Sequence, residues 1–111
     1  MVNQSLDRVY GALADATRRG MLERLRRGPL SVSDLGEPLG MTLAGVGKHV
    51  AVLEGAGLVR TRKTGRVRVC ELHGAAYTEA AAWIDEQRTF WEERLDRVQS
   101  YLEGGTVEEG S

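Results

Sequence analysis

Residues 41–59 constrain the fold most, because a helix start, an amphipathic repeat and a helix stop follow one another closely. Thr42 suits the N-cap of a helix, since its hydroxyl can accept a hydrogen bond from a free amide of the first turn. Four apolar residues then recur on one helical face: Leu43, Val46, Val50 and Leu53. The segment Gly55-Ala56-Gly57 ends the pattern. The sequence therefore predicts a short helix with one buried face.

The opposite face of this helix carries small side chains and one cation. Its members are Ala44, Lys48, Ala51 and Gly55. A helix with a small, basic outer face can approach a polyanion closely, as a recognition helix does in the major groove of DNA. Many surface helices carry Ala and Lys without any partner, so the segment that follows is needed to decide between the two interpretations.

That segment, residues 58–72, predicts a β-hairpin rich in positive charge. Residues 58–63 and 67–72 read as strands, and residues 64–66 as the turn. Five cations crowd the hairpin: Arg60, Arg62, Lys63, Arg66 and Arg68. Like charges repel one another, and a phosphate backbone would neutralise them. The hairpin is therefore interpreted as the wing that follows a helix-turn-helix.

Three helices are expected before this pair. Ser5 is the expected cap of the first, whose apolar face holds Leu6, Val9, Tyr10 and Leu13. Asp15 or Thr17 caps the second, in which Met21, Leu22 and Leu25 face inward. The third lies in residues 30–35, with Ser31 or Ser33 as its cap. The predicted fold class is α+β, mostly α: a winged helix-turn-helix with the element order α-α-α-α-β-β-α.

The last predicted helix, residues 75–102, has two apolar stripes. One comprises Tyr77, Ile84, Trp91, Leu95, Val98 and Leu102, and the other Trp83, Phe90 and Tyr101. One stripe can cover the domain's own core, and the other needs a partner, most simply a second copy of the chain. The alternative is that the first helix covers it within the monomer. The predicted dimer interface comprises Leu6, Val9, Tyr10, Leu13, Trp83, Phe90, Trp91 and Tyr101.

Length and charge narrow the class of protein. The 111 residues suit one domain, expected over residues 1–103, with an acidic, disordered tail at 104–111. Up to residue 73 the chain has 12 Lys and Arg against 7 Asp and Glu, and after it 3 against 9. A basic body with an acidic C-terminal third suits a DNA-facing surface plus a remote element. No signal peptide or membrane-length apolar run is evident, so we expect a soluble, cytoplasmic protein.

The chain has few residues of the types that commonly bind metals or perform catalysis. One cysteine, Cys70, and two histidines, His49 and His73, have no ligand spacing among them, so neither a metal nor a cofactor is expected. Cys70 is expected to pack beneath the hairpin as a small apolar group. His49 either contacts DNA or forms a hydrogen bond at the domain edge. No convergent catalytic set is apparent, so an enzyme is not expected.

Four segments carry a family resemblance: residues 12–19, 30–35, 46–59 and 90–96, the last reading Phe-Trp-Glu-Glu-Arg-Leu-Asp. Together they resemble the ArsR-type winged-helix transcriptional regulators, in a branch without metal sites. The resemblance covers about residues 6–102. It implies a homodimer built through the first and last helices, which binds palindromic operators in double-stranded DNA, usually as a repressor released by a signal.

The resemblance also implies site residues. Thr42, Ala44, Gly47, Lys48 and His49 match positions that read DNA, and Arg66 and Arg68 match wing positions that touch phosphate; Arg62 and Lys63 complete the predicted DNA-binding set. The family often has Ser where this chain has Gly47. Its metal sensors carry a Cys pair near the third helix, or His and Asp ligands on the last helix, whereas residues 30–35 contain no Cys and the last helix contains no His. The predicted function is a sequence-specific transcriptional regulator. The alternative is a dimeric protein-interaction module with weak or no DNA binding, which Gly47 and the near-zero net charge favour.

Overall fold

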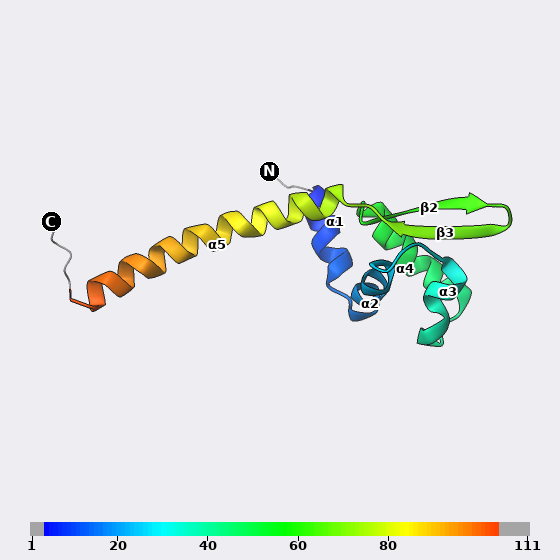
Figure 1. Cartoon of the computed structure of the whole chain (residues 1–111), viewed down its shortest axis with the longest axis horizontal. Coiled ribbons are helices and arrows are strands. Elements are labelled where there is room, and N and C mark those ends of the chain that lie inside the picture. Colours follow the sequence, from blue (N-terminus) through cyan, green and yellow to red (C-terminus); the bar gives the residue numbers. More distant parts are fainter. Residues whose placement is uncertain (1–3, 105–111) are drawn as a thin grey trace. The chain divides into compact units, whose positions relative to one another are not determined.

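The computed structural model describes residues 4–104 and shows a mostly helical chain with a small antiparallel sheet (Figure 1). The elements follow in the order α1 (Gln4–Leu13), α2 (Ala16–Leu25), β1 (Leu30–Ser31), α3 (Val32–Gly36), the 3-10 helix η1 (Glu37–Leu39), α4 (Leu43–Gly55), β2 (Val59–Thr64), β3 (Val67–Leu72) and α5 (Ala75–Leu102). The predicted fold class and the long last helix are confirmed. The expected tail at 104–111 lies outside the described residues beyond Gly104.

The sheet contains a strand that the sequence did not predict. β1 pairs with β3, placing Leu30 opposite Cys70 and Ser31 opposite Val69, so the strand order is β1-β3-β2. Two residues are too few to produce the alternating pattern by which a strand is predicted. Ser31 ends β1 and also caps α3, because its Oγ accepts a hydrogen bond from the Asp34 amide at 3.0 Å.

Residues up to Ala80 and residues from Ala81 onward form two separate compact units. The first unit contains the hydrophobic core, to which every helix from α1 to α4 and all three strands contribute directly or at its edge. The most deeply buried side chains are Val9, Met21, Leu35, Val46, Val50, Leu53, Leu58, Val59 and Cys70. Burial of these apolar groups is the main driving force for the fold.

Three of the predicted helix starts are confirmed, among them Ser31 at α3, and one is wrong. Asp15 caps α2, where its carboxylate accepts from the Arg18 amide at 3.0 Å, and Thr42 caps α4, where its hydroxyl accepts from the Gly45 amide at 3.1 Å. Ser5 does not cap α1, because Gln4 and Ser5 are already helical.

Leu43 does not belong to the core, contrary to the amphipathic pattern. Its side chain is 62% exposed, whereas Val46, Val50 and Leu53 are at most 1% exposed. On a helical wheel Leu43 lies roughly 50° from the centre of those three residues, at the edge of the buried arc. It also sits in the first turn of α4. Leu43 is exposed to solvent because it lies both at the edge of the buried face and at the N-terminal end of α4.

Helix α5 contributes to the core only through its first turns. Ala80 is buried, Ala76 and Tyr77 pack against the core, and the Tyr10 hydroxyl donates to the Ala80 carbonyl at 2.7 Å. From Ala81 onward the large apolar side chains of both stripes are exposed: Trp83, Ile84, Phe90, Trp91, Leu95, Val98, Tyr101 and Leu102. The expectation that one stripe covers the core is therefore correct only at Tyr77. Among residues 4–104 no helix is long and apolar enough to cross a membrane.

Candidate nucleic-acid interface

Helices α3 and α4 form a tightly packed helix-turn-helix. A Cβ on Gly36 would overlap the Val46 side chain, so only glycine allows this close approach. The turn passes through Gly40, which ends η1 with a φ of 63°, in the left-handed region that favours glycine. Thr42 then starts α4 through its side-chain cap. Gly36, Gly40 and Thr42 thus determine the path of the backbone between the two helices.

The residues of α4 and its cap that are predicted to contact base edges, Thr42, Ala44, Gly47 and Lys48, form the reading face, which points away from the core. Thr42, Ala44 and Lys48 are exposed, and Gly47 is half-buried, yet a Cβ on Gly47 would meet no atom within 4 Å. No ion pair to Lys48 is formed by the residues that the structure describes. The face therefore offers one cation, one hydroxyl and a flat, accessible backbone.

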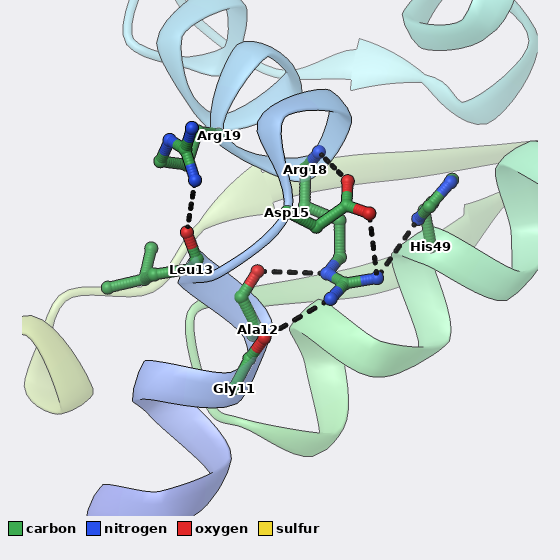
Figure 2. A network of polar contacts seen from close by, with 7 residues as sticks. All are labelled: Gly11, Ala12, Leu13, Asp15, Arg18, Arg19 and His49. Atoms are coloured by element: carbon green, nitrogen blue, oxygen red, sulfur yellow. Dashed lines mark hydrogen bonds and ion pairs between the residues drawn. The ribbon is translucent and has the colours of Figure 1, made fainter.

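His49 is held at the edge of the domain rather than on this open face. Figure 2 shows its ring beside the Arg18 guanidinium, with Nδ1 3.3 Å from Nη1. Of the two roles left open by the sequence, the hydrogen bond at the domain edge is observed. A DNA contact by His49 stays a prediction.

Arg18 is the centre of a network that the sequence did not predict. Its Nε donates to the Ala12 carbonyl at 2.8 Å and its Nη2 to the Gly11 carbonyl at 3.2 Å, at the end of α1 (Figure 2). The hydrogen bond from the Arg18 backbone amide is the main cause that lowers the pKa of Asp15 below its usual value. Because His49 belongs to α4, the network links the α1–α2 junction to the reading helix.

The wing is the hairpin of β2 and β3, which projects beside α3 and α4 (Figure 1). Its two-residue loop is Gly65-Arg66, one residue shorter than predicted, because Thr64 belongs to β2. Gly65 has a φ of 65°, which suits glycine at the first position of a tight hairpin loop. The loop leaves the Arg66 side chain exposed at the tip.

Three of the five wing cations already have acidic partners. Arg60 and Arg62 pair with Glu71 at 3.0 and 3.5 Å, and Arg68 pairs with Glu54 at 3.6 Å. Acidic residues of the chain itself therefore already compensate these three charges. Lys63 and Arg66 are exposed and form no ion pair within residues 4–104.

Glu54 fixes the wing to the end of α4. Its Oε2 accepts from both the amide and the hydroxyl of Thr61, each at 3.1 Å, and its Oε1 faces Arg68. Because Thr61 lies in β2 and Arg68 in β3, one carboxylate contacts both strands. The reading helix and the wing are therefore held in one arrangement.

A groove of about 460 Å³ runs between α4, the start of α3 and the wing. Its lining residues are Ser31, Val32, Ser33, Leu43, Gly47, Arg66, Val67 and Arg68. The structure thus brings together Gly47, Arg66 and Arg68 from the predicted DNA-binding set. Leu43 and Val67 are additional, exposed apolar residues of this groove that the sequence pattern did not indicate.

The predicted dimer residues divide into buried and exposed groups. Val9 is 1% exposed and belongs to the core of its own chain, so it is corrected to a core residue. Leu6, Tyr10 and Leu13 are partly buried at the core's edge, whereas Trp83, Phe90, Trp91 and Tyr101 are exposed on α5. Phe90 and Trp91 pack edge to face, with ring centroids 5.6 Å apart.

No group of three or more His, Cys, Asp or Glu residues is arranged to hold a metal ion in the part of the chain that the structure describes. Cys70 is fully buried beneath the hairpin, which confirms its predicted packing role. Burial, with a smaller contribution from the negative charge of Glu54, raises the pKa of the Cys70 thiol to about 11. The thiol is therefore neutral at physiological pH.

A helix-turn-helix followed by a two-stranded wing defines a winged helix-turn-helix protein, and similar proteins identify the family. Residues 13–62 match the family model described as a helix-turn-helix domain. The chain is 40% identical over 92 residues to the HTH-type transcriptional regulator Rv2034 of Mycobacterium tuberculosis, covering 83% of each chain.

Two solved structures are similar to this chain. A crystal structure described as the ArsR family transcriptional regulator RHA00566 is 43% identical, with a TM-score of 0.77 over 83% of this chain and 95% of that one. Mb0332 of Mycobacterium bovis, described as a homodimeric winged helix-turn-helix DNA-binding domain, is 24% identical, with a TM-score of 0.61 over 85% of this chain and 84% of that one. This chain belongs to the ArsR family of helix-turn-helix transcriptional regulators.

Proposed function

We propose that this regulator is a repressor that binds a palindromic DNA operator as a homodimer. The observation that carries the proposal is the shared groove, because it places the open face of α4 beside the cationic tip of the wing. A recognition helix in the major groove and a basic hairpin on the adjacent phosphates need that juxtaposition. Because the relative Rv2034 comes from a bacterium, whose DNA lies in the cytoplasm, the proposed localisation is cytoplasmic.

In this proposal, base reading belongs to the N-terminal half of α4. Thr42 and Lys48 supply the polar groups, while Ala44 and Gly47 allow the backbone to approach the base edges. Arg66 and Lys63 bind phosphate, because their charges are exposed and unpaired within the described residues. Arg62 and Arg68 contribute less, since each already has an acidic partner.

The proposed dimer is built through α5. Its exposed aromatic residues, Trp83, Phe90, Trp91 and Tyr101, form a large apolar surface that a second copy would cover. The description of Mb0332 as a homodimer supports the same assembly. A two-fold symmetric dimer presents two copies of α4, which explains why a palindromic operator is expected.

Selection from a randomised pool of duplexes tests the proposal. The full chain is used to enrich sequences, and the selected duplex and a scrambled duplex are then titrated at two salt concentrations. We expect a two-fold symmetric consensus and at least about a thousandfold preference over the scrambled duplex. A pool without any enriched sequence would instead favour the protein-interaction module.

Sedimentation of the free protein tests the dimer separately. We expect a species of twice the chain mass of 12.2 kDa at micromolar concentration. Phe90→Glu combined with Trp91→Glu should give monomers, because two charges enter the apolar surface. Asp96→Lys, an exposed charge reversal on the opposite face of the same helix, serves as the matched control and should remain dimeric.

A further inference from the structure

Leu43 is an exposed apolar side chain at the border between the buried face and the open face of α4. It is 62% exposed in the first turn of α4, between Thr42 and Ala44, both of which are also exposed. The same helix buries Val46, Val50 and Leu53 almost completely. An exposed leucine contributes little to folding. Because Leu43 lines the groove beside Gly47 at the start of α4, a molecule bound in the groove would contact it.

The surroundings of Leu43 are those of a polyanion site. It lines the groove with Gly47 on its own helix and with Arg66 and Arg68 on the wing. Arg66 is exposed and has no ion-pair partner within residues 4–104. A groove with cations along one side and an apolar side chain on the reading helix fits nucleic acid better than an apolar protein surface.

The chemistry of the major groove then identifies the contact. Base edges in that groove present hydrogen-bond donors and acceptors, with one apolar group among them, the C5-methyl of thymine. Leucine has neither donor nor acceptor in its side chain, so it cannot read the polar pattern. N-terminal residues of a recognition helix are those that reach base edges.

We propose that Leu43 is a specificity residue that selects thymine in each half-site by packing against the thymine methyl group. The inference rests on the proposed DNA-binding function and specifies which base the start of α4 prefers. The spacing of Leu43 suits a buried residue, yet its side chain is exposed. A contact with the thymine methyl group gives this exposed side chain a role.

The experiment removes the methyl group and the leucine independently. The duplex selected from the randomised pool is resynthesised with deoxyuridine in place of thymine, one symmetric pair of positions at a time. This substitution removes only the methyl group. The probes are titrated with wild type, with Leu43→Ala and with Val52→Ala. Val52 is a matched control, because it is an apolar residue of α4 that is 44% exposed but does not line the groove.

For wild type and Val52→Ala we expect one symmetric thymine pair whose replacement weakens binding by about fourfold per methyl group. Leu43→Ala should bind the thymine and deoxyuridine duplexes equally, and it should fold, since Leu43 is not in the core. A melting curve close to that of wild type verifies the fold.

Three other outcomes are distinguishable. Sequence-specific binding by wild type that ignores every deoxyuridine substitution overturns the inference and leaves the proposed function intact. A methyl dependence that persists in Leu43→Ala overturns it as well, because another residue then reads the methyl group. Absence of any sequence preference in the pool overturns both the inference and the proposed function.

Discussion

A Cβ placed on Gly36 would lie 3.1 Å from the Cβ of Val46 and 3.2 Å from its Cγ1, and would overlap its Cγ2. Gly36 ends α3 and Val46 belongs to α4, so this contact sets how closely the two helices of the DNA-binding motif approach. Gly36 has a φ of −92°, which alanine adopts without strain. Any cost of a side chain here is therefore steric.

Gly36→Ala should lower the free energy of unfolding by about 1–3 kcal/mol, the usual cost of overpacking a core. Urea denaturation measures the change. Gly47→Ala is the matched control, because its Cβ meets no atom within 4 Å and alanine favours the helix by up to about 1 kcal/mol. Equal stability of Gly36→Ala and wild type would show that the helices are not in close contact there.

Arg18→Ala should lower the free energy of unfolding by about 1–3 kcal/mol, because the Ala12 carbonyl loses its donor and the Gly11 carbonyl keeps only the Ala14 amide. The Arg18 side chain is only 17% exposed, so water replaces it poorly. Arg27→Ala is the control: Arg27 is exposed and has no ion pair within the described residues, so its change should stay within about 0.5 kcal/mol. If Arg18→Ala and Arg27→Ala had similar melting temperatures, the hydrogen bonds of Arg18 would not stabilise the fold as proposed.

The Cys70 thiol should not react with a disulfide reagent at pH 8 in the folded protein. Its pKa is raised to about 11 by burial, so the reactive thiolate is scarce and inaccessible. Full reaction is expected after denaturation. Val67→Cys places a thiol at a position that is 48% exposed on the neighbouring loop end and should add one rapidly reacting group. Fast stoichiometric labelling of the native wild type would contradict the buried position.

Asp15 should make the stability depend on pH at the acidic end. Its pKa is lowered from 3.8, chiefly by the Arg18 amide, so its charged form is favoured in the folded state. The stabilisation is therefore present above pH 3.8 and is lost as the pH falls below that value. Asp15→Asn keeps a capping acceptor but lacks the charge. Wild type should exceed this variant in melting temperature at pH 6 by more than at pH 3; a constant difference would refute the assignment.

Local chemistry determined which features the sequence could predict. Thr42 and Asp15 carry capping groups, and the spacing of Val46, Val50 and Leu53 defines a helical face, so α2 and α4 were recognisable. The hairpin was recognisable because residues 67–72 alternate and Gly65 marks the turn. Each of these signals lies within a few residues of the structure that it predicts.

The remaining features depend on residues far apart in the sequence. Arg18 contacts His49 only because α4 packs beside the α1–α2 junction, and Arg60 meets Glu71 only because the register of β2 and β3 places them opposite each other. Leu43 has the right spacing for the core, and only the packed structure shows that the core ends before it. No periodicity in a single sequence carries this information.

The proposed function depends above all on a division of roles, in which α4 reads bases while the tip of the wing binds phosphate. Wild type, Lys48→Ala, Arg66→Ala and the paired-charge control Arg62→Ala are compared on the selected and the scrambled duplex at two salt concentrations. Lys48 lies on the open face of α4, Arg66 is unpaired within the described residues at the wing tip, and Arg62 is held by Glu71.

The measured quantities are the ratio of the two affinities and the slope of binding against salt. Arg66→Ala should weaken both duplexes by similar factors and reduce the log-log salt slope by about one unit for each phosphate that the protein no longer neutralises, with a smaller change for Arg62→Ala. Lys48→Ala should reduce the difference in binding free energy between the selected and the scrambled duplex. The expected reduction is about 1–3 kcal/mol per half-site if the lysine binds guanine through two hydrogen bonds. The division of roles is contradicted if Arg66→Ala alone abolishes the preference for the selected duplex while Lys48→Ala leaves it intact.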